Sequence, residues 1–343
     1  MQIEAVDLFC GAGGLTAGLR QAGIKVKAGV DCESSCQFAY EFNNQTKFIH
    51  KDVADITAEE LKQRFSNGAI KLLAGCAPCQ PFSSYNQGKD ASIDKKWPLL
   101  YHFSRLIKEV QPEFVTMENV PDVIKHKVYH DFIDNLKNQG YNITAQEVEC
   151  IKYGIPQTRR RHVVLASKIA KLELLPATHQ DYVGVREIIS DLEPIEAGGK
   201  SKTDPLHASA KLSAINLQRI RLSKPGGTWR DWPEEIRANC HKKDSGKSYP
   251  SVYGRMEWDK PAPTMTTLCY GYGNGRFGHP EQDRAISLRE AALIQTFPKD
   301  YIFHAPMAKI SFKLIGRMIG NAVPVRLGEI IGLSFQQHLE MLK

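Results

Sequence analysis

The sequence lacks several features that would place it in whole classes of protein. It has no run of about 18 apolar residues, so we expect no membrane-spanning helix. The stretch from Ile3 to Phe9 reads as a strand without a basic region or a cleavage site, so we expect no signal peptide. We find neither internal repeats nor low-complexity segments. These absences favour a globular protein of the cytoplasm.

Cysteines are few and show no paired spacing. The eight cysteines among 343 residues stand at positions 10, 32, 36, 76, 79, 150, 240 and 269. This scatter is typical of reduced thiols rather than of a disulfide framework. Only Cys76 and Cys79 form a close pair, and no second pair with interleaved histidines accompanies them, so we expect no zinc or other metal.

Positive charge, by contrast, is concentrated. The formal net charge is +7, and residues 200–255 hold twelve Lys and Arg against five acids, which accounts for the whole excess. A basic lobe on an otherwise neutral chain favours a polyanion partner, most simply nucleic acid. An ordinary solvated surface is the alternative interpretation.

Strand-like and helix-like segments alternate through the first half of the chain. Thr57 and Glu60 form a capping box for a helix that runs to Phe65, and apolar strands are expected at 6–9, 26–30, 70–74, 114–117, 143–148 and 162–166. Strands separated by single helices predict an α/β fold with a doubly wound, mostly parallel, Rossmann-like sheet that binds ligands at the strand C-termini.

Regular alternation ends after about Pro176. Glycine pairs, prolines and tryptophans follow, and helices are expected only at 209–223, 287–296 and 313–342. The predicted organisation is therefore an α/β domain over 1–178, a smaller irregular basic domain over 179–304, and a segment over 305–343 that returns to the first domain.

Cys79 is the most informative residue. It follows the apolar stretch from Ile70 to Ala74, and Pro78 and Pro81 stiffen the turn around it. A thiol held at a strand end is well placed to attack a substrate. A buried structural cysteine and a redox pair with Cys76 are the alternatives.

A glycine-rich stretch, Asp7 to Gly14, lies between the first expected strand and helix, where the backbone can approach a ligand closely. Asp31 ends the second strand and could bind both hydroxyls of a ribose, and Asp52 could accept from an adenine amino group. Together they indicate an adenosine-type cofactor. NAD is the usual candidate, but the spacing is not G-x-G-x-x-G. Turn glycines and surface acids are the alternative.

Glu118 follows the strand Phe114 to Met117, so a parallel sheet would bring it to the same edge as Cys79. Gln157, Arg159 and Arg161 precede another strand, and strand alternation would point all three to one side. Two guanidinium groups there could fix a carboxylate, contact phosphate, or favour the thiolate. A surface basic cluster is the alternative.

These motifs, in this order, resemble those of DNA (cytosine-5)-methyltransferases of the bacterial restriction-modification type. The matching residues span nearly the whole chain: Phe9-x-Gly11-x-Gly13, Pro78-Cys79-Gln80-Pro81-Phe82-Ser83, Glu118-Asn119-Val120, Gln157-x-Arg159-x-Arg161, Arg289 to Ala292, Gln295 to Pro298 and Gly320 to Pro324. The chain departs from many relatives at Cys76-Ala77. The resemblance argues against a redox pair and makes Cys76 an expected packing residue.

The resemblance implies S-adenosyl-L-methionine as cofactor and a cytosine flipped out of duplex DNA as substrate. Cys79 would add to C6 of the ring, which makes C5 nucleophilic enough to take the methyl group. Glu118 would bond N3 and the exocyclic amine, and Arg159 and Arg161 would support the adduct and O2. Loss of the C5 proton and of the thiol would release 5-methylcytosine.

The resemblance also assigns further residues. Those implied for cofactor binding are Phe9, Gly11, Ala12, Gly13, Gly14, Asp31, Cys32, Asp52, Val53, Pro78, Leu100, Asn321 and Val323. Those implied for DNA binding are Gln80, Ser83, Gln157, Thr266, Asn274 and Arg276, while Lys242, Lys243 and Lys247 would meet phosphates. The polar stretch from Ser83 to Lys96 would be a lid over the flipped base.

By the same resemblance, the protein would methylate cytosine within a short duplex sequence and protect host DNA from a cognate restriction endonuclease. It would act as a monomer in the cytoplasm, on nucleoid DNA. A tRNA cytosine methyltransferase of similar fold is one alternative, and the long irregular lobe favours DNA over it. A catalytically silent DNA-binding protein is another, and the intact catalytic set argues against it.

Overall fold

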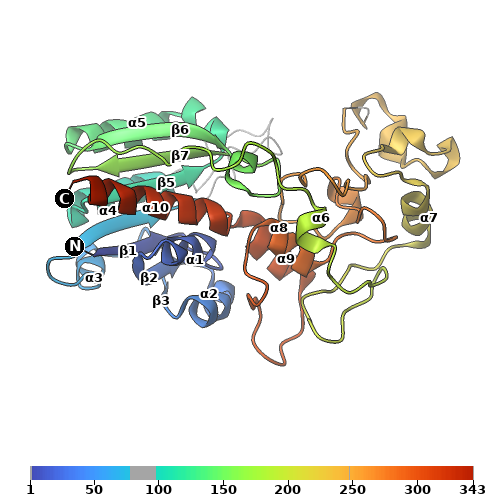
Figure 1. Ribbon diagram of the computed structural model, residues 1–343, viewed down its shortest axis with the longest axis horizontal. Helices are drawn as coiled ribbons and strands as arrows, with labels where there is room; N and C mark the ends of the chain where they lie inside the picture. Colours follow the sequence, from blue (N-terminus) through green and yellow to red (C-terminus); the bar gives the residue numbers. More distant parts are fainter. Residues whose placement is uncertain (1, 78–97, 247, 343) are drawn as a thin grey trace. The chain divides into compact units, whose positions relative to one another are not determined.

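The computed structural model describes residues 2–77, 98–246 and 248–342 (Figure 1). The chain forms two compact units. The first consists of Met1–Tyr153, Arg160–Thr178 and Val323–Lys343, and the second of Gly154–Arg159 and His179–Ala322.

The first unit is built on a seven-stranded sheet with the strand order β3-β2-β1-β4-β5-β7-β6. Strands β1 to β5 pair in parallel, whereas β7 is antiparallel to both β5 and β6. This confirms the predicted doubly wound, mostly parallel fold. The strands are β1 (Ile3–Leu8), β2 (Lys25–Asp31), β3 (Lys47–His50), β4 (Ile70–Gly75), β5 (Phe114–Asn119), β6 (Asn142–Glu149) and β7 (Arg160–Ser167).

Alternation along the strands sorts side chains between the two faces of this sheet. Val115 and Met117 join a core cluster with side chains of α4 and α5, whereas Phe114 stacks on Phe335 of α10 with ring centroids 4.8 Å apart. In Figure 1, α10 lies across the sheet beside α1. The helices of this unit are α1 (Gly14–Gln21), α2 (Gln37–Asn44), α3 (Ala58–Lys62), α4 (Pro98–Val110), α5 (Lys127–Asn138) and α10 (Val325–Met341).

The contact between α1 and α10 requires glycine. A Cβ atom at Gly18 would lie 2.2 Å from the carbonyl oxygen of Val325, which no side chain could tolerate. This close approach ties the C-terminal helix to the helix that follows β1, so the end of the chain supports the first βα turn.

The second unit has little regular structure. Its helices are α6 (Arg186–Ile189), α7 (Ala214–Leu222), α8 (Leu288–Ile294) and α9 (Phe312–Asn321), joined by short 3-10 turns, and its described β-structure consists of isolated bridges. An aromatic cluster includes Trp229, Trp232 and Tyr272, and His241 stacks on Trp229 at a centroid distance of 4.2 Å.

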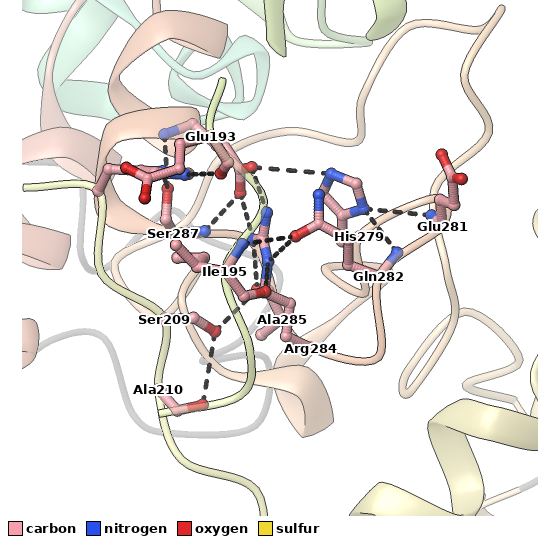
Figure 2. A network of polar contacts seen from close by, with 12 residues as sticks. Glu193, Ile195, Ser209, Ala210, His279, Glu281, Gln282, Arg284, Ala285 and Ser287 are labelled. Carbon is pink, nitrogen blue, oxygen red and sulfur yellow. Dashed lines mark hydrogen bonds and ion pairs between the residues drawn. The ribbon is translucent and has the colours of Figure 1, made fainter. Parts of the chain in front are cut away.

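A buried polar network forms another part of this unit's interior (Figure 2). Arg284 and Glu290 are fully buried and form two bonds of 2.7 Å, and Ser287 and Glu290 make a capping box for α8. Arg284 also donates to the carbonyl of Ile195, and His279 accepts from the amides of Glu281 and Gln282. Ion pairs and side-chain bonds to the backbone hold the loops of this unit together, as the hydrogen bonds between strands hold the first unit together.

The structure differs from the sequence prediction at several boundaries. The capping box of Thr57 and Glu60 is confirmed, but the helix ends at Lys62. The single helix expected over 313–342 is two helices, because Pro324 separates α9 from α10. The C-terminal return to the first unit therefore begins at Val323 rather than at 305. Among the described residues, no helix combines the length and apolar character needed to cross a membrane.

Candidate active site

The loop after β1 makes a tight glycine turn. Gly11 and Gly13 have φ of 50° and 94°, and Gly13 precedes α1 without a side-chain cap. Phe9 has φ of 60°, a left-handed backbone conformation that is uncommon and strained for an aromatic residue. Ala12 is buried, and Gly14 begins the helix. An uncapped helix start beside close-packed backbone suits a ligand with polar or charged groups.

Asp31, at the end of β2, holds this loop. Its carboxylate accepts the amide of Gly11 at 2.8 Å and the amide of Glu33 at 2.9 Å. The acid predicted to bind a ribose therefore also fixes the glycine turn next to it. Cys32, beside Asp31, is exposed as a residue, but partial desolvation of its thiol and the nearby Asp31 charge raise the pKa of that thiol.

The loop after β3 carries the residues predicted to contact adenine. Asp52 accepts the amide of Ala54 at 2.9 Å, and Val53 is only 2% exposed. Arg105 of α4 donates from Nη2 to the carbonyls of Val53, Ala54 and Ile56 at 3.0 to 3.3 Å. The sequence did not reveal Arg105, because its acceptors lie about 50 residues earlier in the chain.

The remaining predicted cofactor residues lie in different surroundings. Leu100 of α4 and Val323 are each 4% exposed and belong to the first unit. Asn321 is exposed and belongs to the second unit. Pro78 lies outside the described residues. Their part in binding a cofactor stays a prediction.

A buried carboxyl under the glycine loop was also missed. Asp7 is 1% exposed and accepts the hydroxyl of Thr16 at 2.7 Å, and that hydroxyl lies 3.0 Å from the hydroxyl of Tyr40. Burial raises the pKa of Asp7 to about 7. These three side chains connect β1, α1 and α2 beneath the predicted cofactor site.

Glu118 forms the centre of the candidate catalytic site. It lies in β5, is 3% exposed, and its Oε1 is 2.7 Å from Nε of Arg161 in β7. Its Oε2 accepts the thiol of Cys76 at 2.8 Å. The register that pairs Gly75 with Met117 places Cys76 alongside Glu118, at the carboxyl ends of β4 and β5. An acid and an arginine therefore lie together at this edge of the sheet.

Cys79 lies outside the described residues, as do Gln80, Ser83 and the predicted lid from Ser83 to Lys96. Their roles stay predictions. The last described residue before them, Ala77, is buried, and its carbonyl accepts from Nδ2 of Asn119 at 3.2 Å. The chain that leads into the cysteine motif is thus attached to the residue that follows Glu118.

The other members of the Gln-x-Arg-x-Arg motif are used differently. Arg159 is 2% exposed and donates to the carbonyls of Met265, Gly320 and Ala322 at 3.0 to 3.5 Å. Its guanidinium therefore acts as a tie within the second unit, and its predicted support of the base stays a prediction. Strand alternation does not apply to Gln157 and Arg159, because β7 begins only at Arg160.

Gln157 also makes contacts inside the second unit. It is fully buried, donates to the carbonyl of Ile294 and to Oε1 of Gln295, and accepts the amide of Met265. Both polar atoms of its side-chain amide are engaged inside the second unit, which gives Gln157 a structural role, and its predicted DNA contact stays a prediction.

The predicted DNA-reading residues of the second unit lie nearer the surface. Thr266 and Asn274 are exposed. Arg276 is partly buried, its Nη1 donates to the carbonyl of Gly227 at 2.7 Å, and burial lowers its pKa. Arg276 thus also holds its own loop, a role that the sequence did not reveal. Base reading by these three residues stays a prediction.

Comparison with known proteins gives a consistent result. The family described as C-5 cytosine-specific DNA methylase matches residues 3–337. The Type II methylase M.HgiDII of Herpetosiphon aurantiacus is 53% identical over 342 residues, which cover 98% of this chain and 96% of that protein. The Type II methyltransferase M1.BsuMI of Bacillus subtilis is 33% identical, covering 96% of this chain and 80% of that one.

Solved structures show the same fold. An E. coli structure described as a prophage-encoded DNA modification methyltransferase has a TM-score of 0.76 at 24% identity and covers 99% of this chain and all of its own. The Schizosaccharomyces pombe Dnmt2 methyltransferase has a TM-score of 0.65 at 16% identity, covering 100% of each chain. At these identities the likeness concerns the fold alone.

Proposed function

Because the chain belongs to the C-5 cytosine-specific DNA methylases and is thus a DNA cytosine-5 methyltransferase, we propose that it methylates a cytosine flipped out of duplex DNA, with S-adenosyl-L-methionine as donor. The single observation that carries this proposal is the buried pair of Glu118 and Arg161 at the carboxyl end of β5. A buried acid with a fixed arginine can bond a ring nitrogen and support charge that develops on the ring.

The residues around the glycine loop fit the proposed donor. Gly13 allows the left-handed turn before α1, Asp31 ends the neighbouring strand, and the order of strands reverses between β1 and β4, where such sheets bind nucleotides. Phe9, Asp31, Val53 and Leu100 would hold the adenosine part. When bound, the donor supplies an electrophilic methyl group on sulfur.

We propose that Cys79 acts as the nucleophile. Its thiolate adds to C6 of cytosine, and the electron pair displaced toward C5 makes this carbon reactive toward the methyl group. In its acid form Glu118 donates a proton to N3 as the thiolate adds, and its second oxygen accepts from the exocyclic amine, while Arg161 keeps the carboxyl group oriented. C5 would then bond the methyl carbon, and the electrons of the broken S–C bond would stay on the donor sulfur, which leaves as a neutral thioether. A base then removes the C5 proton, the electron pair expels the Cys79 sulfur, and 5-methylcytosine is released.

The second unit would contact the duplex. Its excess of Lys and Arg suits the phosphate backbone, and the exposed Thr266 and Asn274 are candidates for base contacts, with Arg276 beside them. We further propose that the modification protects host DNA from a cognate endonuclease in the cytoplasm, where the enzyme works on nucleoid DNA. A monomer is sufficient, since one base is modified in each event.

Methyl transfer assays test this proposal directly. The protein is incubated with labelled S-adenosyl-L-methionine and either duplex DNA or tRNA, and bisulfite sequencing then maps modified cytosines. We expect label in duplex DNA at one short recurring sequence. Label in tRNA with none in DNA would contradict the proposal, and so would transfer to adenine.

A further inference from the structure

Cys76 occupies a position that the proposed mechanism does not use. We expected a packing residue, but the side chain is only partly buried, and its sulfur donates to Oε2 of Glu118 at 2.8 Å. We propose that Cys76 is a positioning residue, whose thiol holds the Glu118 carboxylate in the orientation that meets the base. This inference rests on the proposed catalytic role of Glu118.

The sheet fixes where the thiol lies. Gly75 pairs with Leu8 of β1 on one side and with Met117 of β5 on the other, and the amide of Cys76 continues toward β1 by donating to the carbonyl of Leu8 at 3.4 Å. The backbone at Cys76 is thus still part of the sheet, one residue beyond β4. Its side chain meets Glu118, which follows Met117, without any loop having to move.

The two contacts of Glu118 divide its two oxygens. Arg161 lies against Oε1, and Cys76 donates to Oε2. A carboxylate held on one oxygen alone can still rotate about its last bond, whereas contacts on both oxygens define its plane. Because Glu118 must align with two neighbouring atoms of the base, fixing this plane before the base arrives reduces the reorganisation that catalysis requires.

The thiol is a weak donor, so its effect should be moderate. Loss of one hydrogen bond to a charged group, weakened because the donor is sulfur, corresponds to a fall in kcat of about 3- to 10-fold. We expect this fall in Cys76→Ala, with little change in KM for either substrate. Cys76→Ser, which keeps a donor, should restore most of the lost turnover. Cys240→Ala, an exposed thiol of the second unit, is the matched control and should behave as wild type.

A double-mutant cycle with Glu118→Gln separates positioning from a general structural effect. Each variant is measured in single turnovers at saturating enzyme, with its thermal unfolding midpoint recorded. We expect Cys76→Ala to reduce the rate in the wild-type background and to have almost no further effect in Glu118→Gln. An equal fall in rate in both backgrounds would overturn the inference. Wild-type turnover by Cys76→Ala would also overturn it, provided that Glu118→Gln lowers the rate.

The same cycle shows separately whether the proposed function fails. Near wild-type turnover by Glu118→Gln would refute the catalytic role of Glu118, whatever Cys76 does. Infrared spectra then test the contact without measuring activity. The S–H band of Cys76 is isolated by subtracting the spectrum of Cys76→Ala from that of wild type, and likewise in the Glu118→Ala background. We expect this band at a lower frequency in wild type than in Glu118→Ala. An unchanged band would overturn the inference.

Discussion

The two units of this protein are stabilised in different ways. In the first unit, apolar side chains on parallel strands form the core, and single acids such as Asp7 and Glu118 are buried beside them. In the second unit, both partners of an ion pair, Arg284 and Glu290, are fully buried. A regular sheet can therefore place reactive side chains at the ends of its strands, whereas an irregular unit needs specific polar contacts to hold its loops.

Breaking the buried pair of the second unit should have the largest effect on stability. Glu290→Gln leaves the Arg284 guanidinium charged in a fully buried site, which costs about 3–5 kcal/mol of unfolding free energy. Urea denaturation measures the change. Asp134→Asn, in the exposed pair with Lys137 of α5, is the control and should change stability by less than about 0.5 kcal/mol. Equal losses would erase the contrast between the units.

The dependence of stability on pH should have opposite slopes in the two units. Burial raises the pKa of Asp7 from 3.8 to about 7 and lowers the pKa of His279 from 6.5 to about 4. Folded Asp7 holds its proton where the unfolded residue has lost it, so stability falls as pH rises from about 4 to 7, by at most about 4 kcal/mol. Folded His279 stays neutral where the unfolded residue is charged, so stability falls as pH drops from about 6.5 to 4, by at most about 3 kcal/mol.

Single substitutions separate these two slopes. The two contributions nearly cancel in the wild type between about pH 4 and 6.5, so each substitution should expose the other contribution. Asp7→Asn should leave a rise of stability with pH over this range. His279→Asn should leave a fall, because asparagine can still accept the amides that follow it. Unfolding free energies from denaturant titrations at several pH values provide the measurement. A wild-type slope in Asp7→Asn would show that this carboxyl does not titrate as described.

Two arginines of one motif should respond differently to substitution. Arg161→Lys keeps a positive charge beside the buried Glu118 carboxylate but not the planar guanidinium, and should lower kcat about 100-fold with a nearly unchanged unfolding midpoint. Arg159→Ala removes a buried donor from the carbonyls of Met265 and Gly320 and should lower the unfolding free energy by about 2–4 kcal/mol. The carbonyl of Ala322 keeps its bond from Gln295. Activity assays paired with calorimetry test both variants. The account fails here if the two variants lose the same property.

The smallest expected effect concerns DNA affinity. Lys242 is exposed in the second unit, and Lys242→Gln should reduce the slope of log affinity against log salt by about 0.9 if it meets one phosphate. Lys137→Gln removes the same charge from the first unit and serves as the control. Fluorescence anisotropy with labelled duplex gives the slopes. Equal slopes for both variants and wild type would argue against a phosphate contact at Lys242.

The sequence predicted the first unit better than the second for a physical reason. Strands such as β4 and helices such as α1 are local, and their apolar runs and glycine turns can be read from a few consecutive residues. The contacts that build the second unit join residues far apart in the chain, such as Arg289 with Asp204 and Arg284 with Ile195. No pattern in a few consecutive residues predicts such pairs.

The candidate site shows the same division. Asp31 and Glu118 could be predicted because each ends a recognisable strand. Arg105 and the thiol of Cys76 could not, because their roles depend on which strands and loops become neighbours in the sheet. The break at Pro324 was predictable, since a proline disfavours helix at the residue before it.

Trapping with a fluorinated base tests the central claim most directly. Duplex DNA with 5-fluorocytosine at the target position is incubated with the protein and S-adenosyl-L-methionine, and denaturing electrophoresis with peptide mass analysis follows. Because fluorine cannot leave as the C5 proton does, we predict a stable covalent complex attached through Cys79, and none with Cys79→Ala. A wild-type enzyme that methylates cytosine but forms no such complex, or a complex attached elsewhere, would contradict the account.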